Sequence, residues 1–186
     1  EQSVVLQAFL AGLFTWTCTI IGSGIVFFFK NVSRKLLDTM QGFAAGVMIA
    51  ASFWSLLAPS ISYAEPIYGS WSWVPAAVGF LLGGYFLRFI DAIIPHLHLG
   101  HDIAKAEGGS KEERKKLSKT ALLFLAITIH NIPEGLAVGV TFGAVANNFS
   151  QAAYVGALGL ALGIGLQNIP EGSALSIPIR TDGKTR

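Results

Sequence analysis

The sequence has few charged residues. They make up 13% of the 186 residues, about half of the roughly 25% that is usual for a soluble domain. Ten of them lie in residues 97–119, so the rest of the chain is almost uncharged. This scarcity argues against a soluble enzyme and against a disordered chain. A net charge of only +2 gives no reason to expect a nucleic-acid partner.

Cysteine is nearly absent as well. Cys18 is the single cysteine of the sequence, which excludes an internal disulfide and a metal site built from several cysteines. What the chain has instead is apolar residues, at 52% of the total, with a mean hydropathy of +0.56. The composition therefore predicts a protein that crosses a membrane several times.

Five apolar segments are long enough to cross a bilayer, which takes about 20 residues as a helix. We predict an all-α, polytopic membrane helix bundle that forms a single transmembrane domain over residues 1–186. Its helices are expected at about 4–29, 36–64, 72–95, 118–142 and 151–179. The connections are short except for one loop at about 96–119.

The basic residues predict the orientation. Twelve of the 13 Lys and Arg residues lie in residues 30–35, 105–119 and 180–186, which fall on one side of the membrane if five helices alternate in direction. The positive-inside rule places that side in the cytoplasm. We therefore expect a multi-pass protein of the cell inner or plasma membrane, with its N-terminus outside and the long loop inside.

Glycines recur at every fourth position within four of the predicted helices. Such rows let membrane helices approach closely, so we expect these glycines to mark helix contacts. They are Gly42 and Gly46, Gly79 and Gly83, Gly135, Gly139 and Gly143, and Gly159 and Gly163.

Two carboxylates interrupt the last two apolar segments. Glu134 and Glu171 lie well inside them, and no Lys or Arg lies within 120–142 or 151–179 to pair with either one. A charged side chain at the centre of a membrane helix costs on the order of 3 kcal/mol. The carboxylates are therefore either protonated or in contact with a cation or water.

The residues around the two carboxylates repeat. The segments are His130-Asn131-Ile132-Pro133-Glu134-Gly135 and Gln167-Asn168-Ile169-Pro170-Glu171-Gly172. Positions four apart share one helix face, so each glutamate lies beside the first residue of its motif and next to the asparagine. Each proline also leaves a backbone carbonyl without its helical partner. Carboxylate, imidazole and carbonyl donors suit zinc, iron, manganese or cobalt.

Other interpretations of these residues exist. A single intramembrane His is more often a hydrogen-bonded packing residue, and a single Glu can be a proton relay. The doubled motif favours metal coordination over a structural network. An intramembrane metalloprotease would need a pattern such as H-E-x-x-H, which the sequence lacks. We therefore expect no enzyme, with a metalloprotease or a metal-sensing membrane protein as the alternatives to a transporter.

The two motifs resemble the signatures of the Zrt/Irt-like metal transporters, the ZIP family, and particularly of its bacterial members. The resemblance extends to the long loop after the third helix. It implies import of divalent transition-metal ions into the cytoplasm through a two-metal site between the fourth and fifth helices. Zinc is the expected ion, with cadmium, iron and manganese as further substrates.

The resemblance also implies which residues bind. One metal position would be formed by His130, Glu134, Gln167 and Glu171. A second would use Asn131, Asn168 and the shared glutamates, and Met48 on the second helix matches a position that adds a thioether in some bacterial members. Gln167 stands where many members of the family have His.

Family members have eight membrane helices, so the chain resembles the first five and is expected to belong to a longer protein. The expected partners are divalent metal ions and membrane lipid, with a homodimer left open, and no cofactor is expected beyond the transported ion. His96, His98 and His101 begin the long loop, where they would either bind metal or be solvated.

Overall fold

The computed structural model describes residues 3–28, 33–97, 103–112, 117–147 and 149–181, and the prediction of an all-α chain with five long apolar helices is confirmed. The membrane-length helices are α1 (Val4–Phe28), a second helix in several parts, α4 (Trp73–Ile93), α6 (Lys119–Asn147) and α7 (Gln151–Thr181). The second consists of α2 (Arg34–Ala51), the π-helical η1 (Ser52–Leu57) and α3 (Ala58–Tyr68). Short 3₁₀ turns follow at η2 (Gly69–Trp71) and, in the long loop, at η3 (Ile103–Lys105).

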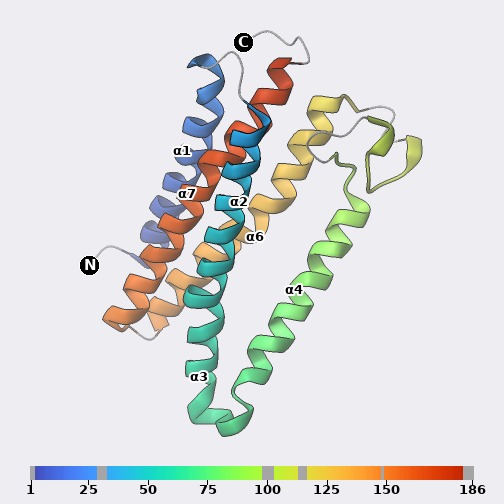
Figure 1. Ribbon diagram of the computed structural model, residues 1–186. Coiled ribbons are helices and arrows are strands. Elements are labelled where there is room, and N and C mark those ends of the chain that lie inside the picture. Colours follow the sequence, from blue (N-terminus) through green and yellow to red (C-terminus); the bar gives the residue numbers. More distant parts are fainter. Residues whose placement is uncertain (1–2, 29–32, 98–102, 113–116, 148, 182–186) are drawn as a thin grey trace.

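Helix α7 is the centre of the bundle. It packs along α1 and also contacts α2 and α6, while α4 leans away and touches α6 only near one end (Figure 1). Buried apolar residues accordingly gather on α7, including Ala157, Leu160, Ile164 and Leu175, whereas Ala76 is the one buried residue of α4. The helix that carries the second sequence motif is thus also the helix on which the others pack.

Several helix ends differ from the sequence prediction: the second helix begins at Arg34 and continues to Tyr68, and α7 ends at Thr181. Two further ends have a clear local reason. Helix α4 ends at Ile93 instead of residue 95, because Ile94 precedes Pro95 and takes an extended conformation at φ −93° and ψ 120°. Helix α6 continues to Asn147, because Val145 in its last turn is buried in the core cluster shared with α7. Tertiary packing extends this helix beyond what the sequence pattern predicts.

The alternating directions of the helices bring the basic segments together. The start of α2, the loop after α4 and the end of α7 all lie at the upper end of the bundle (Figure 1). An alternation of this kind is what the predicted orientation assumes.

The prediction that glycines at every fourth position mark close helix contacts is wrong for most of these glycines. In the part of the chain that the structure describes, nothing lies within 4 Å of an added Cβ at Gly42, Gly46, Gly79, Gly83, Gly135, Gly139, Gly143 or Gly159, and Gly163 meets only ordinary contacts. The close approach occurs between α1 and α7. A Cβ on Gly22 would lie 2.1 Å from the Ile169 carbonyl oxygen, and one on Gly172 would lie 2.3 Å from the Thr19 carbonyl oxygen.

We expect Gly22→Ala to destabilise the bundle, because its methyl group would collide with the backbone of α7. Overpacking of this kind costs about 1–3 kcal/mol in unfolding free energy. Gly24→Ala is the matched control, since it lies on the same helix with open space around its Cβ. Thermal unfolding in detergent measures both; equal melting temperatures for the two variants would contradict the close contact.

Candidate metal centre

The two motifs lie opposite each other near the middle of α6 and α7. Gln167 is fully buried on α7, and its Nε2 group donates a hydrogen bond to Oε1 of Glu134 on α6. Glu171 is half-buried one turn further along α7, within electrostatic range of Glu134. The structure therefore brings the first residue of one motif to the carboxylate of the other.

Three buried oxygen atoms at this place lack a hydrogen-bond partner among the described residues. They are Oε2 of Glu134, Oε1 of Gln167 and Oδ1 of Asn168. A buried polar atom without a partner costs about 1–3 kcal/mol, and such groups in native structures call for an explanation such as an ion or a water molecule. A cation beside the Glu134–Gln167 pair would satisfy an oxygen of each of these two side chains.

Apolar side chains bound the motif on both sides. On α6 and α7 one cluster includes Val138, Phe142, Leu160 and Ile164. A second cluster, toward the other end of both helices, is formed by Leu97, Leu122, Leu123 and Leu175. The polar residues lie between the two clusters along both helices.

Helix α1 is hydrogen-bonded to α7 beside the second motif. Asn168 Nδ2 donates to the Thr15 carbonyl at 3.2 Å, and the Ser173 hydroxyl lies 2.9 Å from the Gly22 carbonyl. The Ser23 hydroxyl on α1 donates a hydrogen bond of 3.3 Å to the Gly172 carbonyl on α7. The sequence reasoning did not find these α1 residues. Their signal is the small pair Gly22 and Ser23 within a run of large apolar side chains.

The remaining predicted ligands lie differently. His130 is exposed on α6 in the described chain, and Met48 on α2 is 41% exposed. Asn131 turns its amide along its own helix and donates to the Ile127 carbonyl at 2.8 Å. The structure thus brings Gln167 and Glu134 together, with Glu171 one turn further along α7. Asn168 directs its amide nitrogen to α1 and Asn131 bonds along its own helix, while His130 and Met48 are exposed.

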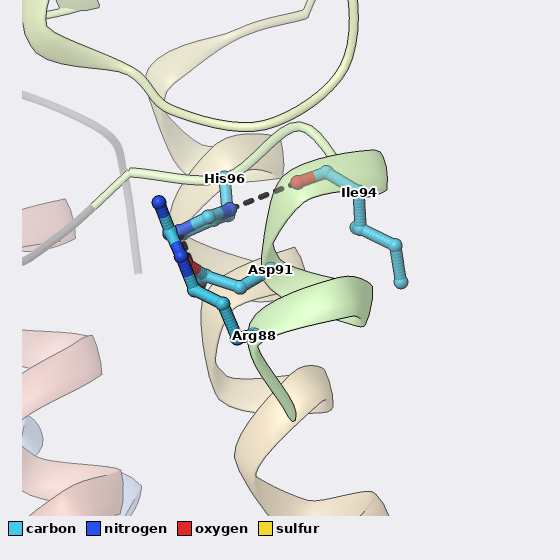
Figure 2. A network of polar contacts seen from close by, with 4 residues as sticks. All are labelled: Arg88, Asp91, Ile94 and His96. Carbon is cyan, nitrogen blue, oxygen red and sulfur yellow. Dashed lines mark hydrogen bonds and ion pairs between the residues drawn. The ribbon is translucent and has the colours of Figure 1, made fainter. Parts of the chain in front are cut away.

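A second group of possible ligands lies where α4 enters the long loop (Figure 2). Nε2 of the buried His96 is 2.9 Å from Asp91 Oδ1, and Arg88 pairs with Asp91 at 3.0 Å as the i, i+3 spacing suggests. His96 Nδ1 donates to the Ile94 carbonyl at 2.8 Å, which fixes the orientation of the ring. His98 and His101 lie outside the described residues.

Glu107 completes this group from across the loop. Its backbone pairs with that of His96 through two hydrogen bonds of 2.9 Å. As a result, ligand atoms of Asp91, His96 and Glu107 lie within 4.8 Å of one another. Tetrahedral coordination at about 2.0–2.2 Å places neighbouring ligand atoms roughly 3.3 Å apart, so these three side chains are near the spacing that one ion requires.

The chain is similar in sequence to several zinc transporters. The chain is 40% identical to zinc transporter ZIP11 of Xenopus tropicalis, over 97% of its own length and 73% of that protein. The chain belongs to the ZIP family of zinc transporters. It is also 37% identical to zinc transporter ZIP11 of Homo sapiens, over 98% of the chain and 74% of the relative.

Bacterial relatives match as well. Zinc transporter GufA of Myxococcus xanthus is 36% identical over 94% of the chain and 64% of that protein. Because vertebrate and bacterial members both match, the comparisons do not assign the chain to a bacterial type. No protein-family model and no solved structure matched. Membership in a transporter family confirms that the chain is not an enzyme, and the metalloprotease alternative is set aside.

Proposed function

We propose that this protein carries zinc across a membrane into the cytoplasm and binds it between α6 and α7. The observation that carries the proposal is the contact between Gln167 and Glu134, where one buried oxygen of each side chain has no hydrogen-bond partner among the described residues. The relatives named above are zinc transporters, which supports zinc as the ion. Intramembrane carboxylates in such a place typically mark an ion pathway.

The binding set has two positions in this proposal. Glu134, Gln167 and Glu171, with His130, hold one ion, while Asn168 and Asn131 hold the second together with the shared glutamates. His130 turns inward when an ion is bound, and Asn131 exchanges its bond to Ile127 for the ion. Met48 adds its sulfur from α2 in the conformation that brings α2 nearer to α6.

The donor set explains how an ion could be bound and released. Two carboxylates offset the charge of one divalent ion, and the amide oxygens complete its coordination without adding charge. The site contains no thiolate, so it lacks the ligand that makes structural zinc sites hold tightly. Transport requires such moderate binding. Oxygen and imidazole donors also accept cadmium, iron or manganese, which we propose as further substrates.

The orientation follows from charge. The end of the bundle that carries the basic segments faces the cytoplasm, by the positive-inside rule. The N-terminus of α1 is then outside, in the inner or plasma membrane of the cell. A metal sensor would use the same residues and would differ from a transporter only by its lack of flux.

We expect zinc uptake into liposomes by the full-length protein, and loss of uptake in the double variant Glu134→Ala/Glu171→Ala. Each single variant should lower zinc affinity by at least about tenfold, and by more than His130→Ala, because each carboxylate is shared between two ions. Thr128→Ala is the control, since Thr128 is exposed on α6 and its hydroxyl donates to the Phe124 carbonyl of the same helix.

Fluorescent zinc indicators inside the liposomes measure uptake, and isothermal titration measures affinity. Uptake that survives in the double variant would contradict the assigned site. An equal or larger loss of affinity in His130→Ala would contradict the sharing of the carboxylates. Zinc binding without uptake by the unaltered protein would indicate a sensor.

A receiving site at the cytoplasmic end is the second part of the proposal. Asp91, His96 and Glu107 have the spacing for one ion, and the bond from His96 Nδ1 to Ile94 leaves Nε2 directed at Asp91. A ring nitrogen held by a backbone carbonyl is how metal-binding histidines are usually oriented. An ion released from the membrane site would meet these side chains next.

This site predicts one zinc ion that remains bound in the Glu134→Ala/Glu171→Ala protein. We expect His96→Ala in that background to remove it and Glu107→Gln to weaken it by about tenfold. Glu112→Gln is the control, because Glu112 is an exposed carboxylate of the same loop. Titration calorimetry gives the stoichiometry, and an unchanged value in His96→Ala would exclude this site.

A further inference from the structure

The second membrane helix changes its hydrogen bonding midway. Within η1 the turn is π-helical, and the N–H of Ala58 bonds to the Phe53 carbonyl, five residues earlier. The cause lies one residue further on. Pro59 has no N–H, and in an ordinary α-helical turn its ring would clash with the Ser55 carbonyl, so that turn is disfavoured there. Single π turns inside α-helices are rare and occur frequently at functional sites.

The two halves of this helix pack on different partners. Helix α2, before the π turn, packs on α7, and η1 itself touches α6 and α7. Beyond the turn, α3 packs against α4 instead, and the two form an arm that stands away from the bundle (Figure 1). The π turn is therefore the joint between the bundle and the α3–α4 arm.

Open space lies on both sides of this joint. A cavity of about 610 Å³ separates it from the hairpin end of α6 and α7, with Ser55, Thr141 and Gly156 among its lining residues. On the other side, a cavity of about 290 Å³ lies between Phe53 and Leu57 and the helix α4. Both spaces are open at the surface of the described chain, so close packing does not hold the turn on these two sides.

Leu56 connects the joint to the metal centre. It lines the larger cavity and also packs against the apolar cluster of Val138, Leu160 and Ile164. That cluster lies between the cavity and the ligands. Thr141 in the cavity wall is seven residues beyond Glu134 on α6, which is about 10 Å along the helix. The cluster and Leu56 thus separate the cavity from the binding set.

We propose that the π turn Ser52–Leu57 is a gate for the transported ion, an inference that rests on the proposed zinc transport. The larger cavity is the antechamber for a hydrated divalent cation, whose water molecules meet the hydroxyl groups of Ser55, Ser62 and Thr141. Movement of the turn withdraws Leu56 from the apolar cluster and opens the path to Glu134. The α3–α4 arm moves with it.

The test is Pro59→Ala, which restores an N–H group and favours an ordinary α-helical turn. We expect the uptake rate at saturating zinc to fall by at least about fivefold, as for other proteins whose turnover depends on a conformational step. Zinc affinity in detergent should remain within about twofold. Pro66→Ala is the matched control, because Pro66 also lies inside this helix but has no π turn beside it; its uptake should be unchanged.

Labelling tests the gate independently of flux. Ser62 lines the cavity, and the native Cys18 is buried, so Ser62→Cys gives a reporter for a polar maleimide. Zinc should change the rate at which the maleimide labels Ser62→Cys when Pro59 is present. In the double variant Ser62→Cys/Pro59→Ala, zinc should leave that rate unchanged. Normal uptake by Pro59→Ala, an equal loss in Pro66→Ala, or an unaltered zinc response of the label would overturn the gate. Absence of uptake by the unaltered protein would instead contradict the proposed function.

Discussion

The structure depends on placing two carboxylates in the middle of membrane helices. Glu134 cannot be left alone at that depth, and the fully buried Gln167 donates a hydrogen bond to it from the neighbouring helix. This contact fixes how α6 and α7 face each other. Apolar clusters lie on either side of this polar group along both helices, and electrostatic interactions are stronger in apolar surroundings than in water. Because lipid offers no hydrogen-bond partner for Glu134, the arrangement of α6 and α7 that places Gln167 beside it is favoured.

Packing and binding use the same helix. Helix α7 contacts α1, α2 and α6, and it carries Gln167 and Asn168 among its most buried side chains. Because Ser173 and Asn168 bond to backbone carbonyls of α1, a displacement of α7 carries α1 with it. Helix α4 has no comparable bond to α7 among the described residues. The bundle thus divides into a firmly joined part that holds the ligands and a loosely attached arm.

Much of this could be predicted from the sequence, because hydropathy and a repeated motif are local signals. Five apolar runs gave five helices, and the i, i+4 spacing put Gln167 and the glutamates on facing surfaces. The contacts between helices were not predictable in the same way. Glycines at every fourth residue do not mark the interface here, whereas Gly22 and Gly172 do, since a close approach depends on which faces meet. The π turn beside Pro59 was missed because a helix-breaking residue has several local outcomes, and only packing selects one.

The two amide side chains of the centre show why this position does not simply use more carboxylates. In Gln167 and Asn168 the nitrogen end is held by Glu134 and by the Thr15 carbonyl, so the buried oxygen end of each remains available as an acceptor. An aspartate in place of Asn168 could not donate to that carbonyl and would repel it. It would also add a third negative charge near Glu134 and Glu171. In the proposed transport cycle these two carboxylates are without an ion for part of the time. Amides therefore supply oxygen ligands whose direction is set by the protein. Because they are neutral, they add no charge repulsion to the site when no ion is bound.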